Sequence, residues 1–193
     1  MEGITLPKSI RLILTSHSSV LLLLLIMVET TLAADTVLGP SSAYLCFDES
    51  RWGKSIRGIS DCDKAIADSE LLSKRDLAAT YSNRGIIYSA NGIYDLAIRD
   101  HSRAIEIRPL LGQAIVNRGN VYFRMGEYEE AVANYDQALQ ISGSANATTY
   151  LNRGLALLEM KSFEQAKASF EQARALNPSS RQIVELLEEV EAP

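Results

Sequence analysis

Residues that carry chemistry are scarce in this chain. It has two histidines and two cysteines among its 193 residues. It also lacks an H-E-x-x-H pair for a catalytic zinc, a glycine-rich phosphate-binding loop, a G-x-S-x-G nucleophile turn and a cysteine–histidine nucleophile pair. These absences predict a protein that is not an enzyme, holds no metal or cofactor and has no small-molecule substrate.

A basic cluster is also missing. The formal net charge is −5 and the isoelectric point is about 5.1. Nucleic-acid-binding proteins present a patch of Lys and Arg to the phosphate backbone. Nucleic acid is therefore not expected as a partner. The composition, with 47% hydrophobic and 22% charged residues, is that of a globular chain rather than a disordered one.

The first 34 residues have the pattern of a targeting segment. Lys8 and Arg11 supply positive charge, and residues 20–28 form an uninterrupted apolar run. Small residues follow, so we expect cleavage near Ala33 or Ala34. The sequence therefore predicts a signal peptide over residues 1–34 and an exported protein.

An uncleaved anchor is the alternative for this segment. Residues 12–32 are almost long enough to span a bilayer, but His17 and Glu29 make them a poor hydrocarbon segment. The protein would meet a membrane only through this segment, and only if it stays uncleaved.

The two cysteines, Cys46 and Cys62, both follow the expected cleavage site. An even cysteine count in an exported protein favours a disulfide. This disulfide would close a loop of about 15 residues and stabilise the fold by roughly 3 kcal/mol in the chain-entropy model. Two free buried thiols are the alternative. A metal site would need further ligands, and no histidine is nearby.

The chain repeats itself downstream of these cysteines. The phrase Asn-Arg-Gly occurs three times, and its glycines are 34 and 35 residues apart. After each glycine come an alanine, a ring residue and a second alanine at matched distances. In chain order the three sets are Gly85, Ala97, His101 and Ala104; Gly119, Ala131, Tyr135 and Ala138; and Gly154, Ala166, Phe170 and Ala173.

This period and spacing resemble the tetratricopeptide repeat over roughly residues 78–180. The resemblance implies an all-α solenoid in which each repeat is a helix-turn-helix pair. We expect three clear repeats, at 78–111, 112–146 and 147–180. Asn91-Gly92 and Gly126 are expected to end first helices in a left-handed conformation, and Lys161 is a weaker stop at the third position.

The repeat glycines need a packing reason, because glycine inside a helix costs about 1 kcal/mol relative to alanine. We expect Gly85, Gly119 and Gly154 to let the two helices of a repeat approach closely. The alanines Ala97, Ala131 and Ala166 are expected to be the small residues that these glycines meet.

Helices are also expected on both sides of the repeats. Residues 58–66 align with residues 97–105, so residues 35–77 are expected to form a degenerate helical pair, with helices at 44–53 and 56–72. Residues 181–193 carry an apolar stripe and predict a capping helix. A cysteine-containing first pair is similar to that of small exported bacterial repeat proteins, which implies the bacterial periplasm, with inner-membrane anchoring by residues 12–32 as the alternative.

The resemblance also implies a site, because first helices of such repeats line a concave groove. Asn83, Asn117 and Asn152 would stand in a row there, and their amides suit the backbone of an extended peptide. Asn120, Phe123 and Arg124 are the other candidates for peptide binding. Alternatively, the three asparagines bond across neighbouring repeats and only fix the stack.

The arginines beside these asparagines have a different expected role. Arg84, Arg118 and Arg153 are expected to pack their stems and to pair their heads with carboxylates rather than with a ligand. The lysines that the family uses to hold a C-terminal carboxylate are missing, so that grip is not expected.

Together these patterns predict a non-catalytic scaffold for protein–protein interaction. It would hold a protein or peptide partner in its concave groove, outside the cytoplasm. The alternative function is a self-associating subunit of an envelope assembly.

Overall fold

The computed structural model describes residues 41–52 and 56–191, and the side chains of Trp52 and Glu191 lie outside this description. Contacts between Cα atoms divide the chain into two units, Met1–Ser41 and Ser42–Pro193. Ser41 is the only described residue of the first unit. The signal peptide expected over residues 1–34 therefore lies outside the described residues, as does the end of the expected capping segment.

Helices joined by turns and loops make up the described residues of the second unit, which contain no strand. The expected all-α class is thus confirmed. In chain order the helices are α2 (Ser42–Trp52), α3 (Arg57–Ala67), a short 3-10 helix (Ser69–Leu71), α4 (Lys74–Ala90), α5 (Tyr94–Ile107), α6 (Gly112–Met125), α7 (Tyr128–Leu139), α8 (Ala147–Glu159), α9 (Phe163–Leu176) and α10 (Arg181–Glu191).

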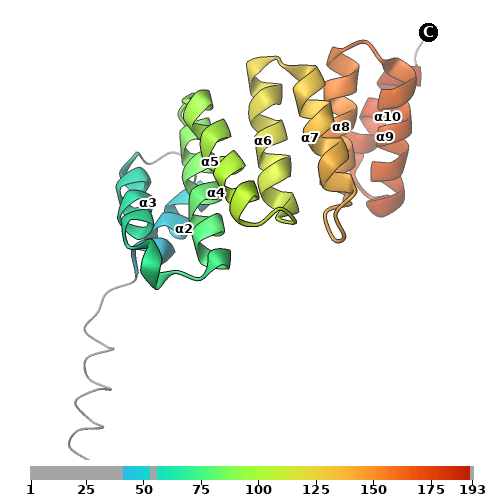
Figure 1. The fold of residues 1–193 in the computed structure, drawn as a ribbon. Coiled ribbons are helices and arrows are strands. Elements are labelled where there is room, and N and C mark those ends of the chain that lie inside the picture. Colours follow the sequence, from blue (N-terminus) through green and yellow to red (C-terminus); the bar gives the residue numbers. More distant parts are fainter. Residues whose placement is uncertain (1–40, 53–55, 192–193) are drawn as a thin grey trace, which may run out of the picture. The chain divides into compact units, whose positions relative to one another are not determined.

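Consecutive helices pack as pairs, and the pairs stack in chain order (Figure 1). The pairs are α2/α3, α4/α5, α6/α7 and α8/α9. The second helix of each pair also packs on the first helix of the next pair, and first helices contact one another from pair to pair. This is the expected helix-turn-helix solenoid.

The close approach within each repeat is between a glycine and a ring. A Cβ built on Gly85 would lie 2.8 Å from Cε1 of His101, and one built on Gly119 would lie 2.8 Å from Cε1 of Tyr135. A Cβ on Gly154 would collide with the ring of Phe170. The expectation that the glycines meet alanines was therefore wrong about the nearest neighbour, because the rings reach across the helix interface while the alanines are simply buried.

The turns inside the three repeats share one geometry. Gly92, Gly126 and Lys161 have φ angles of 76°, 81° and 58°. In each turn the next backbone N–H donates to a carbonyl five residues earlier, at 2.8–3.0 Å, which closes the end of the first helix. Lys161 is the only non-glycine residue with positive φ among the described residues. In the third turn a lysine thus adopts the left-handed conformation that glycine adopts without strain.

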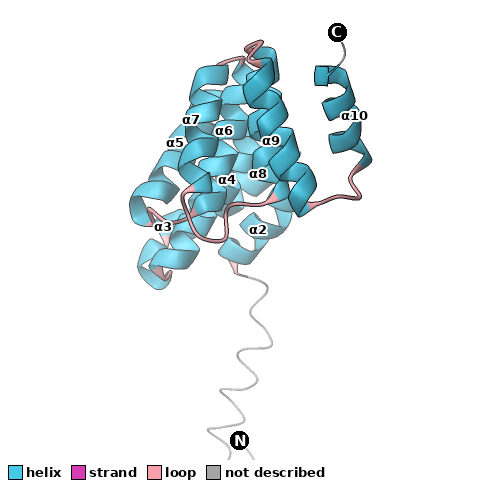
Figure 2. Cartoon of the chain, turned by 90° about the vertical axis from the view of Figure 1, so that its right-hand side faces the viewer, coloured by secondary structure: helices cyan, strands magenta, loops and turns pink. Residues whose placement is uncertain are grey.

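The two ends of the stack are closed differently. Cys46 on α2 and Cys62 on α3 form a disulfide and pack with Ile87 of α4, all three fully buried. The helix expected over 56–72 ends at Ala67 and is followed by the 3-10 helix. At the other end α10 follows α9 and contacts it (Figure 2). Ile183 and Leu187 of α10 are buried in a cluster with Phe170. None of the helices in the described ranges is both long enough and apolar enough to cross a bilayer.

Candidate peptide-binding groove

Cavities lie between neighbouring first helices of the stack. One, of about 260 Å³, lies between α6 and α8, and a second, of about 350 Å³, lies between α4 and α6. They adjoin one another because Asn120 and Arg124 of α6 line both. We call these two adjoining cavities the groove. A third cavity, of about 330 Å³, lies between α2 and the N-terminal half of α4.

Asn120 is the polar centre of the cavity between α6 and α8. Its Oδ1 accepts a hydrogen bond from the hydroxyl of Tyr135 at 2.9 Å and another from Nδ2 of Asn152 at 2.9 Å. Burial raises the pKa of Tyr135, so this hydroxyl remains a donor. Phe123 and Leu155 supply the apolar part of the lining. The cavity thus combines an amide cluster with apolar walls.

Arg124 dominates the cavity between α4 and α6. Its Nη1 donates to the hydroxyl of Ser89 on α4 at 3.0 Å, and its Cζ lies 5.3 Å from the ring centroid of Tyr94. Asn117 lines the same cavity and accepts a hydrogen bond from Gln113 of its own helix at 2.9 Å. Stacking on Tyr94 and the bond to Ser89 therefore hold the guanidinium beside the cavity.

Five of the six predicted peptide-binding residues line the groove. They are Asn117, Asn120, Phe123, Arg124 and Asn152. Asn83 lies apart and lines the third cavity, with Tyr44, Phe47 and Arg75 among its neighbours. The three asparagines of the expected row thus line three different cavities, and only the cavities of Asn117 and Asn152 adjoin among those described.

Sequence reasoning missed several lining residues. Ile86 and Leu155 directly follow repeat glycines, as Asn120 does, so the shared position was a usable signal. Ser89, Tyr94 and Tyr135 become partners of the groove only through contacts between helices. No sequence spacing indicates those contacts.

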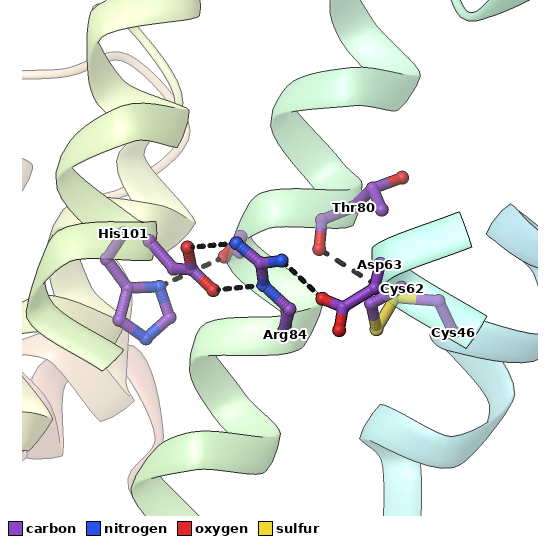
Figure 3. Close-up of polar contacts among 8 residues, drawn as sticks. Cys46, Cys62, Asp63, Thr80, Arg84 and His101 are labelled. Carbon is purple, nitrogen blue, oxygen red and sulfur yellow. Dashed lines mark hydrogen bonds and ion pairs between the residues drawn. A yellow bond between two sulfur atoms is a disulfide. The ribbon is translucent and has the colours of Figure 1, made fainter. Parts of the chain in front are cut away.

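Arg84 bridges its own repeat to the helical pair before it. Its Nε and Nη2 donate to the carboxylate of Asp100 at 2.7 and 2.8 Å, and its Nη1 donates to Asp63 on α3 (Figure 3). Asp100 is only 3% exposed. These hydrogen bonds, above all those to Asp100, raise the pKa of Arg84, while burial is the largest influence on the pKa of Asp100 and raises it.

The same bridge recurs in the next two repeats with different partners. Arg153 donates to Ser169 of its own repeat at 2.7 Å and to Asp136 of the preceding one at 2.6 Å. Arg118 donates to Asn134 at 2.7 Å and to Ser102 at 3.0 Å. The expected pairing with carboxylates was therefore wrong for Arg118, whose partners are neutral oxygens. Burial lowers its pKa.

His101 is a buried ring at the floor of the cavity between α4 and α6. It is 1% exposed, and its Nδ1 lies 3.4 Å from the hydroxyl of Ser82. Burial, with a smaller contribution from the charge of Arg118, lowers the pKa of His101 to about 3. The ring is therefore neutral near pH 7 and serves as packing.

Two family models match the repeat region. Both are described as tetratricopeptide repeat, and they match residues 78–109 and 110–179. Together they cover more than half of the chain without a gap. The chain belongs to the tetratricopeptide-repeat family. None of the curated proteins compared with it gives a significant match.

Solved tetratricopeptide-repeat structures have a similar fold. The second such domain of human RPAP3, in complex with the HSP70 peptide SGPTIEEVD, is 26% identical with a TM-score of 0.59, over 63% of this chain and all of that one. The first domain of Spaghetti (RPAP3), bound to the HSP90 peptide SRMEEVD, is 24% identical with a TM-score of 0.56, over 58% of this chain and 89% of that one.

A third similar structure covers more of this chain. The MamA RS-1 ArsTM double mutant is 19% identical with a TM-score of 0.64, over 78% of this chain and 84% of that one. At this identity the likeness concerns the fold alone.

Proposed function

We propose that this protein is a non-catalytic scaffold that holds a partner polypeptide in its groove, outside the cytoplasm. The observation that carries the proposal is the pair of adjoining cavities on α4, α6 and α8, lined by amides, apolar side chains and one guanidinium. Amides suit the backbone of an extended chain, and apolar walls suit its side chains.

The likeness to peptide-binding domains supports this function. The human RPAP3 domain holds a short peptide, and its whole length aligns with this chain. Repeat scaffolds of this kind present their first helices on an extended concave surface. The groove of this chain lies on those helices.

The disulfide supports a location outside the cytoplasm. Disulfides persist in oxidising compartments and are rare in the reducing cytosol. Cys46 and Cys62 are fully buried and joined in the fold. Trapping thiols with an alkylating reagent in intact cells tests the location. The protein is then unfolded without a reductant, still in the presence of the reagent, so that any free thiol is exposed and alkylated. We expect neither cysteine to be alkylated, whereas alkylation of both would place the chain in a reducing compartment.

Site-specific photo-cross-linking tests the function. The full chain is produced with p-benzoylphenylalanine in place of Phe123, which lines the groove. The control has it in place of Glu106 on α5, which is 63% exposed and lines none of the three cavities. We expect a discrete adduct with another polypeptide at position 123 only, identified by mass spectrometry.

Other outcomes of this experiment contradict the proposal. Equal adducts at both positions, or none at either, would mean that the groove is not the binding surface. An adduct joining two copies of this chain would instead favour the self-associating assembly subunit.

A further inference from the structure

The groove carries positive charge in an acidic protein. The chain has a net charge of −5, yet no carboxylate is among the described residues that line the two cavities. Arg124 is the only ionised side chain there, since His101 is neutral. Among the described residues Arg124 has no carboxylate partner, and its contacts are a hydroxyl at 3.0 Å and an aromatic ring. The groove therefore favours an acidic group on its ligand.

Among the described residues that line the two cavities, the one guanidinium belongs to the middle repeat. The position after the repeat glycine holds Ile86, Asn120 and Leu155 in the three repeats. The position of Arg124 holds Ala90 in the first repeat and Glu159 in the third, and Glu159 is not among the residues that line the two cavities. Along the groove the lining consists of Ile86 and Ala90 beside Ser89 on α4, of amides, Phe123 and a guanidinium on α6, and of Leu155 beside Asn152 on α8.

The spacing of the repeats limits how a ligand presents its side chains. Neighbouring packed helices lie about 8–10 Å apart. A polyproline II segment has three residues per turn and rises about 3.1 Å per residue, so equivalent side chains recur every 9 Å or so. In a β-strand the side chains on one face recur about every 7 Å, which fits the distance between neighbouring helices less well. A ligand crossing α4, α6 and α8 in polyproline II conformation would face the groove with every third residue.

We propose that the groove selects an internal acidic segment in which one Asp or Glu is flanked, three residues away on each side, by an aliphatic residue. The carboxylate docks on Arg124 beside Asn117 and Asn120. The aliphatic residues lie against Ile86 and Ala90 on one side and against Phe123 and Leu155 on the other. This inference rests on the proposed peptide-binding function. The ligand segment needs no free C-terminus.

Panning a peptide library tests the inference. Random dodecapeptides displayed within a phage coat protein, so that neither end is free, are panned on the purified full chain. The same library is panned on Arg124→Gln and on Arg174→Gln, a control at an exposed arginine of α9 outside the groove. We expect the unchanged chain and Arg174→Gln to enrich peptides in which an acidic residue has an aliphatic residue three positions away on each side. Arg124→Gln should not enrich these peptides.

A double-substitution cycle then isolates the contact with Arg124. An enriched peptide is synthesised with both ends blocked, and its dissociation constant is measured by fluorescence polarisation. Replacing its acid by the amide is expected to weaken binding about tenfold to the unchanged chain, a magnitude typical of a hydrogen-bonded charge. The same replacement is expected to have little effect with Arg124→Gln.

The remaining outcomes overturn the inference, and they separate it from the proposed function. Enriched peptides without an acid, or the same consensus on Arg124→Gln, would contradict the inference and leave peptide binding in place. No enrichment while Phe123 still cross-links to a partner would also overturn it. No enrichment together with no cross-link at Phe123 would contradict the proposed function itself.

Discussion

Arg84 holds the buried carboxylate of Asp100 with two parallel hydrogen bonds, of 2.7 and 2.8 Å, across the interface between α4 and α5. The next repeat makes the equivalent contact from Arg118 to the neutral Asn134. One fold thus contains a charged and an uncharged version of the same bridge. That pair of versions allows a matched comparison of their stabilities.

Removing the arginine is expected to be more destabilising in the charged version. Arg84→Met leaves Asp100 buried without its cation, and such losses cost about 3 kcal/mol or more. Arg118→Met removes a donor only from neutral oxygens, those of Asn134 and Ser102, which should cost about 1–2 kcal/mol. Urea denaturation of the two variants measures both free energies of unfolding. Equal losses would contradict the importance of the charge on Asp100.

Replacing the repeat glycine by alanine is expected to destabilise the fold although alanine favours helix. In Gly154→Ala the new methyl group meets the ring of Phe170, and overpacking of this kind costs about 1–3 kcal/mol. Thermal denaturation of Gly154→Ala, of Phe170→Leu and of the double variant provides the test. We expect Gly154→Ala to cost less in the Phe170→Leu background. Strict additivity would exclude the ring as the cause.

Replacing the left-handed lysine by glycine is expected to stabilise the third turn. At φ 58° Lys161 carries backbone strain of about 1 kcal/mol, and part of its relief is offset by the greater freedom of glycine in the unfolded chain. Chemical denaturation should show a gain for Lys161→Gly. Gly126→Ala is the converse control, because no atom lies within 4 Å of its added Cβ. It should lose stability, and a loss in both variants would argue against backbone strain.

The buried histidine is expected to make the fold sensitive to acid. In the unfolded chain His101 binds a proton below its ordinary pKa of 6.5, whereas in the folded chain its pKa is about 3. The unfolded state therefore gains more from protonation, and the free energy of unfolding falls as pH falls from about 6.5 toward 3. His101→Phe, which copies the ring of the third repeat, should lose this component. Parallel curves of stability against pH for both proteins would contradict the prediction.

The two interpretations of the asparagine row lead to different results for Asn117 and Asn152. Asn152 bonds Asn120 across neighbouring repeats, so Asn152→Ala should lower stability by about 1 kcal/mol. Among the described residues the side chain of Asn117 bonds only Gln113 on its own helix, so Asn117→Ala should leave stability nearly unchanged and reduce cross-linking at position 123. Denaturation and cross-link yield are measured on both variants. Unchanged cross-linking in Asn117→Ala would restrict these asparagines to a structural role.

Much of the fold could be predicted because small residues and ring residues recur at fixed positions in each repeat. The spacing of Gly119, Ala131 and Tyr135 requires two helices to cross closely, and its recurrence requires the pairs to stack. The partner of each glycine could not be predicted, because both a ring and an alanine follow on the second helix. Only the depth to which Tyr135 and Phe170 reach across the interface decided between them.

The groove was only partly predictable. Asn117, Asn120, Phe123 and Arg124 were indicated by their places on one first helix, and they do line the groove. The separation of Asn83 from this group depends on α2, whose sequence carries no repeat signal. The anchoring of Arg124 by Ser89 joins residues 35 apart in the chain.

By itself the sequence determined that this protein is a stack of helical pairs, since the periodic small residues can be buried in no other regular way. Only the tertiary structure decided which polar groups share a cavity and which charges are compensated. Those properties depend on the juxtaposition of side chains from different repeats, and a linear spacing does not contain that information. Arg124, exposed in the groove, and Arg84, partly buried beside Asp100, are both arginines of first helices at different repeat positions, and only contacts between helices gave each its partners.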